Sequence, residues 1–202
     1  MSNSPAVRTL RLPPANFDNL KVPRTRQPTR NWFKVHRACF SARYFSLNTT
    51  HRFSHGDCPY PLLYLAVDVD TCLFERFGDE AYDRQKSLAN SLWDARVVST
   101  IQVPETHVCD LTKPQTLSSL MVDLTALTNE QLAIPHQWGL AIQRHPANFQ
   151  GIKFKSRFND RACLALFGRD GIEKFLSETR LGPLSTHDAA AVWLDKHKVR
   201  LY

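Results

Sequence analysis

The sequence predicts a single α+β domain built on a mixed β-sheet with flanking helices. A chain of 202 residues, 43% of them hydrophobic, is long enough to bury one substantial core. Short apolar runs typical of buried strands recur along the chain, and stretches of helical length lie between several of them. No segment is repeated, which argues against a repeat architecture.

Positive charge is concentrated at the N-terminal end. The first 37 residues contain eight Lys or Arg and one Asp, an excess equal to the net charge of +7, so the remainder is neutral. A neutral body argues against direct nucleic-acid binding by the folded domain. Because five prolines lie among the basic residues of 1–31, we expect an extended arm there, either partly disordered or draped over the body, and a folded domain over 32–202. The arm is either a solvated leader or a binding segment for an anionic partner or antitoxin.

The sequence also bears on cellular location. No stretch has the roughly 18 uninterrupted apolar residues of a membrane span, and the N-terminal residues lack the hydrophobic core of a signal peptide. Five scattered cysteines, an odd number, favour a reducing environment over a disulfide framework. We therefore expect a cytoplasmic protein with no membrane partner, and delivery into another cell stays open.

A strand–turn–helix unit is predicted within PLLYLAVDVDTCLFERFG. Leu62–Ala66 has the apolar pattern of a strand that is buried on both faces. Asp68 and Asp70 can each cap a helix N-terminus, and residues 71–77 predict two helical turns that Gly78 ends. Regular structure should begin earlier, at Trp32.

The other elements are predicted by the same two criteria, the spacing of apolar residues and the Gly, Pro or polar residues that flank each run. Further strands are expected over residues 32–38, 97–103, 107–111, 151–156, 163–167, 189–194 and 199–201. Further helices are expected near residues 80–93, 115–122, 135–145 and 172–178.

Two polar side chains, Tyr64 and Glu75, lie within the apolar strand–turn–helix unit. A carboxylate among such neighbours is costly to bury unless it has a function. Arg37 is likewise on a predicted strand with apolar neighbours, and its structural alternative is an internal ion pair, for example with Glu75. Arg52 by itself would be an ordinary surface arginine, and Ser156 an ordinary cap. Together the five supply two phosphate-binding cations, a ring, a carboxylate and a hydroxyl, which could hold a dinucleotide without a Gly-rich loop.

Other motifs give weaker signals. His51, His55 and Cys58 are metal-ligand types at short spacing, but no second Cys/His pair with metal-ligand spacing follows, so we interpret them as polar loop residues and expect no metal. The sequence contains no GxSxG, GxxxxGK[ST] or GxGxxG motif, which leaves esterase, P-loop and Rossmann functions without support.

Four segments in order carry a resemblance to a known family: FKVHRACF, HRFSHG, PLLYLAVDVDTCLFERFG and QGIKFKSRFNDRACLALFG. They resemble the RES domain family, which is named for its arginine, glutamate and serine and supplies toxins of toxin–antitoxin pairs. The resemblance extends from Phe33 to about Gly171. It implies a fold similar to ADP-ribosyltransferases, with a split mixed sheet around an NAD cleft.

The resemblance also assigns candidate site residues. The family's arginines fall on Arg37 and Arg52, its tyrosine on Tyr64, its glutamate on Glu75 and its serine on Ser156. We expect Glu75, Arg37, Tyr64 and Ser156 to be catalytic, and Arg37, Arg52, Tyr64 and Ser156 to bind NAD⁺ as a substrate, without a metal.

Family members degrade NAD⁺ by hydrolysis or phosphorolysis, and some ADP-ribosylate a protein. The expected function is therefore that of an NAD⁺-depleting toxin that cleaves the nicotinamide–ribose bond as a glycohydrolase or phosphorylase. The alternatives are a mono-ADP-ribosyltransferase and a non-catalytic nucleotide-binding module. The expected partner is an Xre-like helix-turn-helix antitoxin that blocks the cleft, or another immunity protein.

Overall fold

A computed structural model describes residues 11–82, 86–122, 124–128 and 131–202. Its strands are β1 (Arg24–Gln27), β2 (Arg30–Arg37), β3 (Leu62–Ala66), β4 (Ser87–Leu88), β5 (Arg96–Val103), β6 (Thr106–Asp110), β7 (Gly151–Lys155), β8 (Ala162–Phe167), β9 (Ser177–Pro183) and β10 (Arg200–Leu201). Its α-helices are α1 (Val69–Tyr82), α2 (Asn90–Asp94), α3 (Pro114–Leu120), α4 (Leu124–Thr128), α5 (Ala133–Arg144) and α6 (Asp188–His197). Short 3₁₀ turns are η1 (Phe17–Asn19), η2 (Ile172–Phe175) and η3 (Leu184–Thr186).

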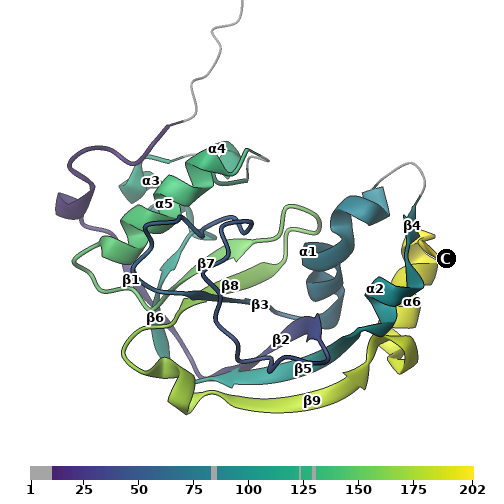
Figure 1. The fold of residues 1–202 in the computed structure, drawn as a ribbon. Coiled ribbons are helices and arrows are strands. Elements are labelled where there is room, and N and C mark those ends of the chain that lie inside the picture. The colour runs from purple at the N-terminus through teal and green to yellow at the C-terminus, as the bar shows by residue number, and fades with distance from the viewer. Residues whose placement is uncertain (1–10, 83–85, 123, 129–130) are drawn as a thin grey trace, which may run out of the picture.

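Eight of these strands form one mixed sheet in the order β1-β6-β7-β8-β3-β2-β5-β9. β6 and β7 run parallel, whereas β3 is antiparallel to both of its neighbours. Figure 1 shows that the sheet is strongly curled, with helices on its concave side. The predicted α+β class with a mixed sheet and flanking helices is confirmed.

The sheet is split between β2 and β3. In the part of the chain that the structure describes, these strands pair at one position, Phe33 opposite Ala66. By contrast, β2 pairs with β5 along its whole length, and so does β3 with β8. The buried thiol of Cys72, on α1, lies close to the backbone of both Val35 and Ala66. The Cys72 side chain is thus placed where β2 and β3 diverge, and a gap opens beyond that point.

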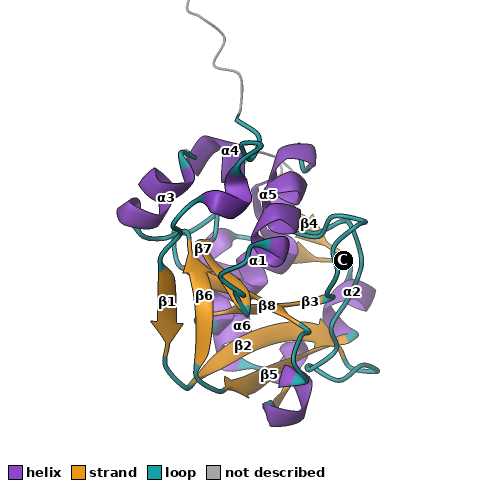
Figure 2. Cartoon of the chain, turned by 90° about the vertical axis from the view of Figure 1, so that its left-hand side faces the viewer, coloured by secondary structure: helices purple, strands orange, loops and turns teal. Residues whose placement is uncertain are grey.

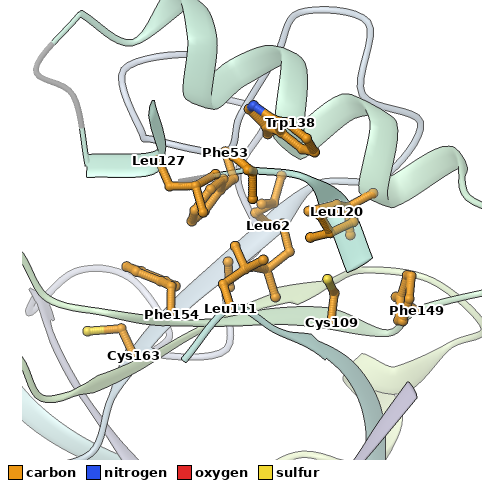
Figure 3. Close-up of a cluster of buried hydrophobic side chains, with 14 of the residues drawn as sticks. Phe53, Leu62, Cys109, Leu111, Leu120, Leu127, Trp138, Phe149, Phe154 and Cys163 are labelled. Atoms are coloured by element: carbon orange, nitrogen blue, oxygen red, sulfur yellow. The ribbon is translucent and has the colours of Figure 1, made fainter. Parts of the chain in front are cut away.

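The core has three parts that follow this division. One lies between the sheet and α3, α4 and α5 and includes Phe53 and Trp138 (Figure 3). A second packs α1 and α6 together through the rings of Phe74 and Trp193, which meet edge to face. These two helices lie on the right in Figure 1, and Figure 2, viewed from the left of Figure 1, has α3 and α5 in front of them. The third lies around Trp32. Because these aromatic side chains are almost fully buried, they fix the two helical groups on either side of the gap.

The N-terminal segment is more structured than we expected. Regular structure begins at η1 and β1 rather than at Trp32, and β1 adds an edge strand to the sheet beside β6. Phe17 is buried against Trp138, whose indole N–H donates to the carbonyl of Arg11 at 2.9 Å. Apolar anchoring thus holds much of the predicted arm on the body, and residues 1–10 lie outside the described residues.

Helix α1 begins as predicted and ends later than predicted. Asp68 Oδ1 accepts the backbone N–H of Thr71 at 2.8 Å and caps the helix, while Asp70 instead accepts a hydrogen bond from Asn159. The prediction that Gly78 ends the helix is wrong, because α1 continues through it. A Cβ at Gly78 would lie 2.5 Å from the Phe158 ring, so this glycine permits close packing.

Further expectations can be compared with the observed elements. The strands β2, β3, β5, β6, β7 and β8 and the helices α3 and α5 are confirmed near their predicted bounds. The helix expected over 80–93 is wrong, because the described part of that range forms the end of α1, β4 and α2, and residues 83–85 lie outside it. The helix expected over 172–178 gives way to η2 and β9, and the strand expected over 189–194 is part of α6. Both differences have a tertiary cause: β9 pairs with the open edge of β5, and α6 packs on α1.

None of the helices in the described ranges is long and apolar enough to cross a membrane.

Two glycines within helices give a stability prediction. A Cβ at Gly139 in α5 would lie 2.2 Å from the backbone carbonyl oxygen of Phe53, whereas the nearest atoms to one at Gly78 would belong to a side chain, the ring of Phe158. We expect Gly139→Ala to lower the free energy of unfolding by about 1–3 kcal/mol, although alanine favours helices by about 1 kcal/mol. Gly78→Ala should have a smaller effect. Chemical denaturation of both variants measures the difference, and a Gly139→Ala protein as stable as the wild type would contradict the assigned packing.

Candidate functional site

A cavity of about 700 Å³ opens at the gap between β2 and β3. Residues of these two strands, of α1, of the long connection from β2 to β3 and of the segment after β7 line it. This volume is typical of pockets that bind small molecules and cofactors. The split in the sheet therefore produces a binding cleft.

The carboxylate of Glu75 lies on the cavity side of α1. Ser156, which follows β7 and is buried, donates its hydroxyl to Glu75 Oε1 at 2.6 Å. The serine is itself held by a turn, because its backbone N–H donates to the carbonyl of Arg161 at 2.8 Å. We expected Glu75 to be enclosed by apolar neighbours, but it is an exposed residue and the apolar side chains Leu73 and Phe77 face the core instead. One oxygen of the carboxylate is thus oriented by Ser156 and the side chain is accessible from the cavity.

Tyr64 lines the cavity from β3. Its hydroxyl accepts the backbone N–H of Phe53 at 3.0 Å and lies 3.3 Å from the Ser54 hydroxyl. Burial raises the pKa of Tyr64 far above its usual range, so the phenol is neutral at physiological pH. Its ring contacts the imidazole of His51, with ring centroids 5.1 Å apart. Tyr64 therefore anchors the connection between β2 and β3 through its hydroxyl and presents an aromatic surface to the cavity.

Arg52 is carried by the segment that Tyr64 anchors, and it also lines the cavity. Its guanidinium lies over the ring of Phe154, 5.7 Å from the ring centroid. Burial lowers the pKa of Arg52 while the Glu75 carboxylate raises it. An arginine under these conditions stays charged, so Arg52 provides a fixed cation beside the carboxylate.

Arg37 is not placed with the other candidates. It is the exposed last residue of β2, opposite Arg96 of β5, and it is not among the residues that line the cavity. The reason is geometrical: β2 diverges from β3 after Phe33 and stays with β5, so its end leaves the cleft. The structure thus brings Arg52, Tyr64, Glu75 and Ser156 together and leaves Arg37 apart.

Lys34 is a cavity residue that our sequence analysis did not single out. Its ammonium donates to the carbonyls of Ala42 at 3.0 Å and Tyr44 at 3.2 Å, which leaves one N–H for a ligand. Burial lowers the pKa of Lys34 to about 8, although the Glu178 carboxylate opposes the shift. A signal was available, because Lys34 stands between Phe33 and Val35 in a predicted strand.

The cavity has an excess of positive charge. Lys34, Arg52, Arg76 and Arg157 line it, against the carboxylates of Glu75 and Asp79. One of these cations, Arg157, forms an ion pair with Asp79. A cationic cleft with low-dielectric walls attracts anionic ligands, and phosphate groups match guanidinium and ammonium donors.

The histidines of the connection contact other residues of the protein. His51 packs on Tyr64, and burial lowers its pKa, so that it is neutral at pH 7. His55 Nδ1 accepts the backbone N–H of Asp57 at 3.0 Å. In the described ranges, no group of three or more His, Cys, Asp or Glu side chains is arranged to hold a metal ion.

Comparisons with known proteins agree with this architecture. Among solved structures, the chain is similar to a chain of the M. tuberculosis MbcT–MbcA toxin–antitoxin complex, with a TM-score of 0.58 and 19% identity over 87% of this chain and 92% of that one. At this level of identity the likeness establishes a shared fold. A search of curated protein sequences gave no significant match. The family model described as the RES domain matches residues 21–186, from before β1 to the end of η3. The chain therefore belongs to the RES domain family.

Proposed function

We propose that this protein is the toxin of a toxin–antitoxin pair and that it consumes NAD⁺ by cleaving the bond between nicotinamide and ribose. The observation that carries the proposal is the carboxylate of Glu75, oriented by Ser156 at the edge of a cationic cleft. Membership of the RES domain family and a fold shared with a chain of a toxin–antitoxin complex support it.

The chemistry suits a carboxylate without a metal. Nicotinamide leaves NAD⁺ as a neutral molecule, and positive charge then develops on the ribose as in other glycosidic cleavages. Because Oε1 of Glu75 already accepts a hydrogen bond from the Ser156 hydroxyl, the second carboxylate oxygen is the one that would accept a hydrogen bond from the ribose 2′-hydroxyl. The negative charge of Glu75 would stabilise the developing cation more strongly in the cleft than in water.

The remaining groups would bind and orient the dinucleotide. Lys34 and Arg52 would hold the pyrophosphate, and the ring of Tyr64 would pack on the nicotinamide half. We expected Arg37 in this clamp, but its position outside the cavity makes Lys34 the better candidate. Water or inorganic phosphate would then capture the ribosyl cation, which gives a glycohydrolase or a phosphorylase.

The proposed partner is an antitoxin that covers the mouth of the cleft, with an Xre-like helix-turn-helix protein as our first candidate. The similar solved structure is that of a toxin–antitoxin complex, which supports a protein partner of this kind. Blocking the cleft would be sufficient for inhibition, because Glu75 and the cations all lie inside it or at its edge.

Replacing the carboxylate tests the mechanism directly. We expect Glu75→Gln to reduce kcat for NAD⁺ by at least about 100-fold, the usual cost of removing one electrostatic stabiliser of a transition state, with little change in Kd. Glu173→Gln, an exposed substitution in η2, is the matched control and should leave kcat unchanged. Steady-state kinetics and calorimetric binding measure both quantities, and full NAD⁺ consumption by Glu75→Gln would contradict the mechanism.

The identity of the acceptor can be read from the products. In phosphate-free buffer, a glycohydrolase releases nicotinamide and ADP-ribose, whereas ADP-ribose-1″-phosphate that forms only with added phosphate identifies a phosphorylase. We expect one of these two patterns in NMR spectra of NAD⁺ incubated with the purified protein. Unchanged NAD⁺, with label from NAD⁺ transferred to a lysate protein, would favour the mono-ADP-ribosyltransferase instead.

Lys34 predicts a pH dependence. Below pH 8 its ammonium is charged and can bind the pyrophosphate; as the pH rises through about 8 the charge is lost. We therefore expect kcat/KM for NAD⁺ to fall above about pH 8, and Lys34→Arg to abolish this fall because arginine stays protonated. The control is Arg37→Ala, which removes a cation outside the cavity and should keep the wild-type profile. An unchanged profile in Lys34→Arg would assign the titration to another group.

A further inference from the structure

Large apolar side chains are exposed on the loop that follows β2, beside the cleft. Phe40, Tyr44 and Leu47 are 52%, 59% and 62% exposed. Tyr44 lines the cavity, and the Phe40 ring stacks on its ring with centroids 5.9 Å apart and an interplanar angle of 22°. Exposure to water gives such a ring pair no stabilisation of the fold. Exposed apolar groups that cluster at one place are typical of binding sites.

The backbone below this ring pair is fixed from two sides. Lys34 donates to the carbonyls of Ala42 and Tyr44, at 3.0 and 3.2 Å. In addition, the carboxylate of Glu178, on β9, accepts the Ser41 hydroxyl at 2.8 Å and the backbone N–H of Ala42 at 3.0 Å. The loop is therefore held in one conformation before any ligand arrives, which lowers the entropic cost of binding.

The loop and the carboxylate lie near opposite ends of β3. The loop runs into the bridge between Ser46 and Leu62, the first residue of β3. The carboxylate of Glu75 lies near the other end, because its partner Ser156 follows β7, whose final residues pair with the start of β8, opposite Ala66. At roughly 3.3 Å per residue, β3 spans about 13 Å between Leu62 and Ala66. The length of β3 along the cleft is comparable with the distance between the two bases of an extended dinucleotide.

Cations lie between the two ends. Lys34 bonds the loop, and Arg52 lies over Phe154 in the same cavity as Tyr64. A dinucleotide with its nicotinamide riboside at Glu75 and its pyrophosphate at these cations would extend its second base towards the loop. We propose that the adenine stacks on Tyr44, backed by Phe40, and that this contact makes the enzyme prefer the dinucleotide to nicotinamide mononucleotide. The inference rests on the proposed function and adds the adenine subsite to it.

The test compares two substrates that share the scissile bond and differ in the adenylate half. Base–aromatic stacking is lost in Tyr44→Ala, so KM for NAD⁺ should rise at least about fivefold, with kcat within about twofold of the wild type. Cleavage of nicotinamide mononucleotide should be unchanged. Tyr44→Phe keeps the ring and should behave as the wild type, and so should Tyr202→Ala, which removes an exposed tyrosine at the C-terminus. Equal losses with both substrates, or no loss with either, would overturn the assignment.

A binding measurement separates this inference from the proposed activity. AMP carries the adenine and a phosphate but no nicotinamide, so its binding does not depend on catalysis. Saturation-transfer NMR and calorimetry should show AMP binding to the wild type and to Tyr44→Phe, and binding at least about fivefold weaker to Tyr44→Ala. If the wild type leaves NAD⁺ intact but AMP binding follows this pattern, the proposed activity fails and the adenine subsite stands. If NAD⁺ is cleaved and AMP binds equally to all three proteins, the subsite is overturned and the activity stands.

Discussion

The structure depends on the divergence of two central strands, β2 and β3, after a single paired position in the described part of the chain. β2 and β3 pair at Phe33 and Ala66 and then each remains with its other neighbour, while Cys72 occupies the point of divergence. The ladders with β5 and β8 keep the backbone of both strands paired on their outer sides, so the gap can open without breaking the sheet. The part of the cleft wall that β2, β3 and α1 form is regular structure, which holds Lys34, Tyr64 and Glu75 more rigidly than a loop would.

The connection between the diverging strands must be long, and the fold stabilises it through side chains of its surroundings. The Tyr64 hydroxyl accepts a hydrogen bond from the backbone N–H of Phe53, and Gly139 allows α5 to approach the backbone of Phe53 closely. Hydrogen bonds from Lys34 and to Glu178 hold residues 41–44. These contacts set the positions of Arg52 and Tyr44 at the cavity. Residues that bind the long connection are therefore the ones that shape the cleft.

Electrostatics and geometry act together in this cleft. A carboxylate oriented by a buried serine lies near one end, cations lie along the middle, and aromatic rings are available near both ends. The arrangement is complementary to an extended molecule with a negatively charged centre and a site of developing positive charge at one end. This complementarity, within the RES domain family, is the physical basis of the proposed NAD⁺ chemistry.

The sequence by itself determined the strands β2, β3 and β5 to β8. Strands buried in a central sheet consist largely of apolar residues, and such runs can be recognised without knowledge of the tertiary structure. It also offered Asp68 and Asp70 as helix caps, of which the fold uses Asp68. Of its five candidate site residues, the fold gathers Arg52, Tyr64, Glu75 and Ser156 at one cleft. Only the tertiary structure decided that β9 completes the sheet, that the run before Trp193 is helical, and that Lys34 enters the cavity while Arg37 leaves it. The reason is that local patterns record burial and capping, whereas the partner of a strand and the point where two strands separate depend on contacts between distant segments.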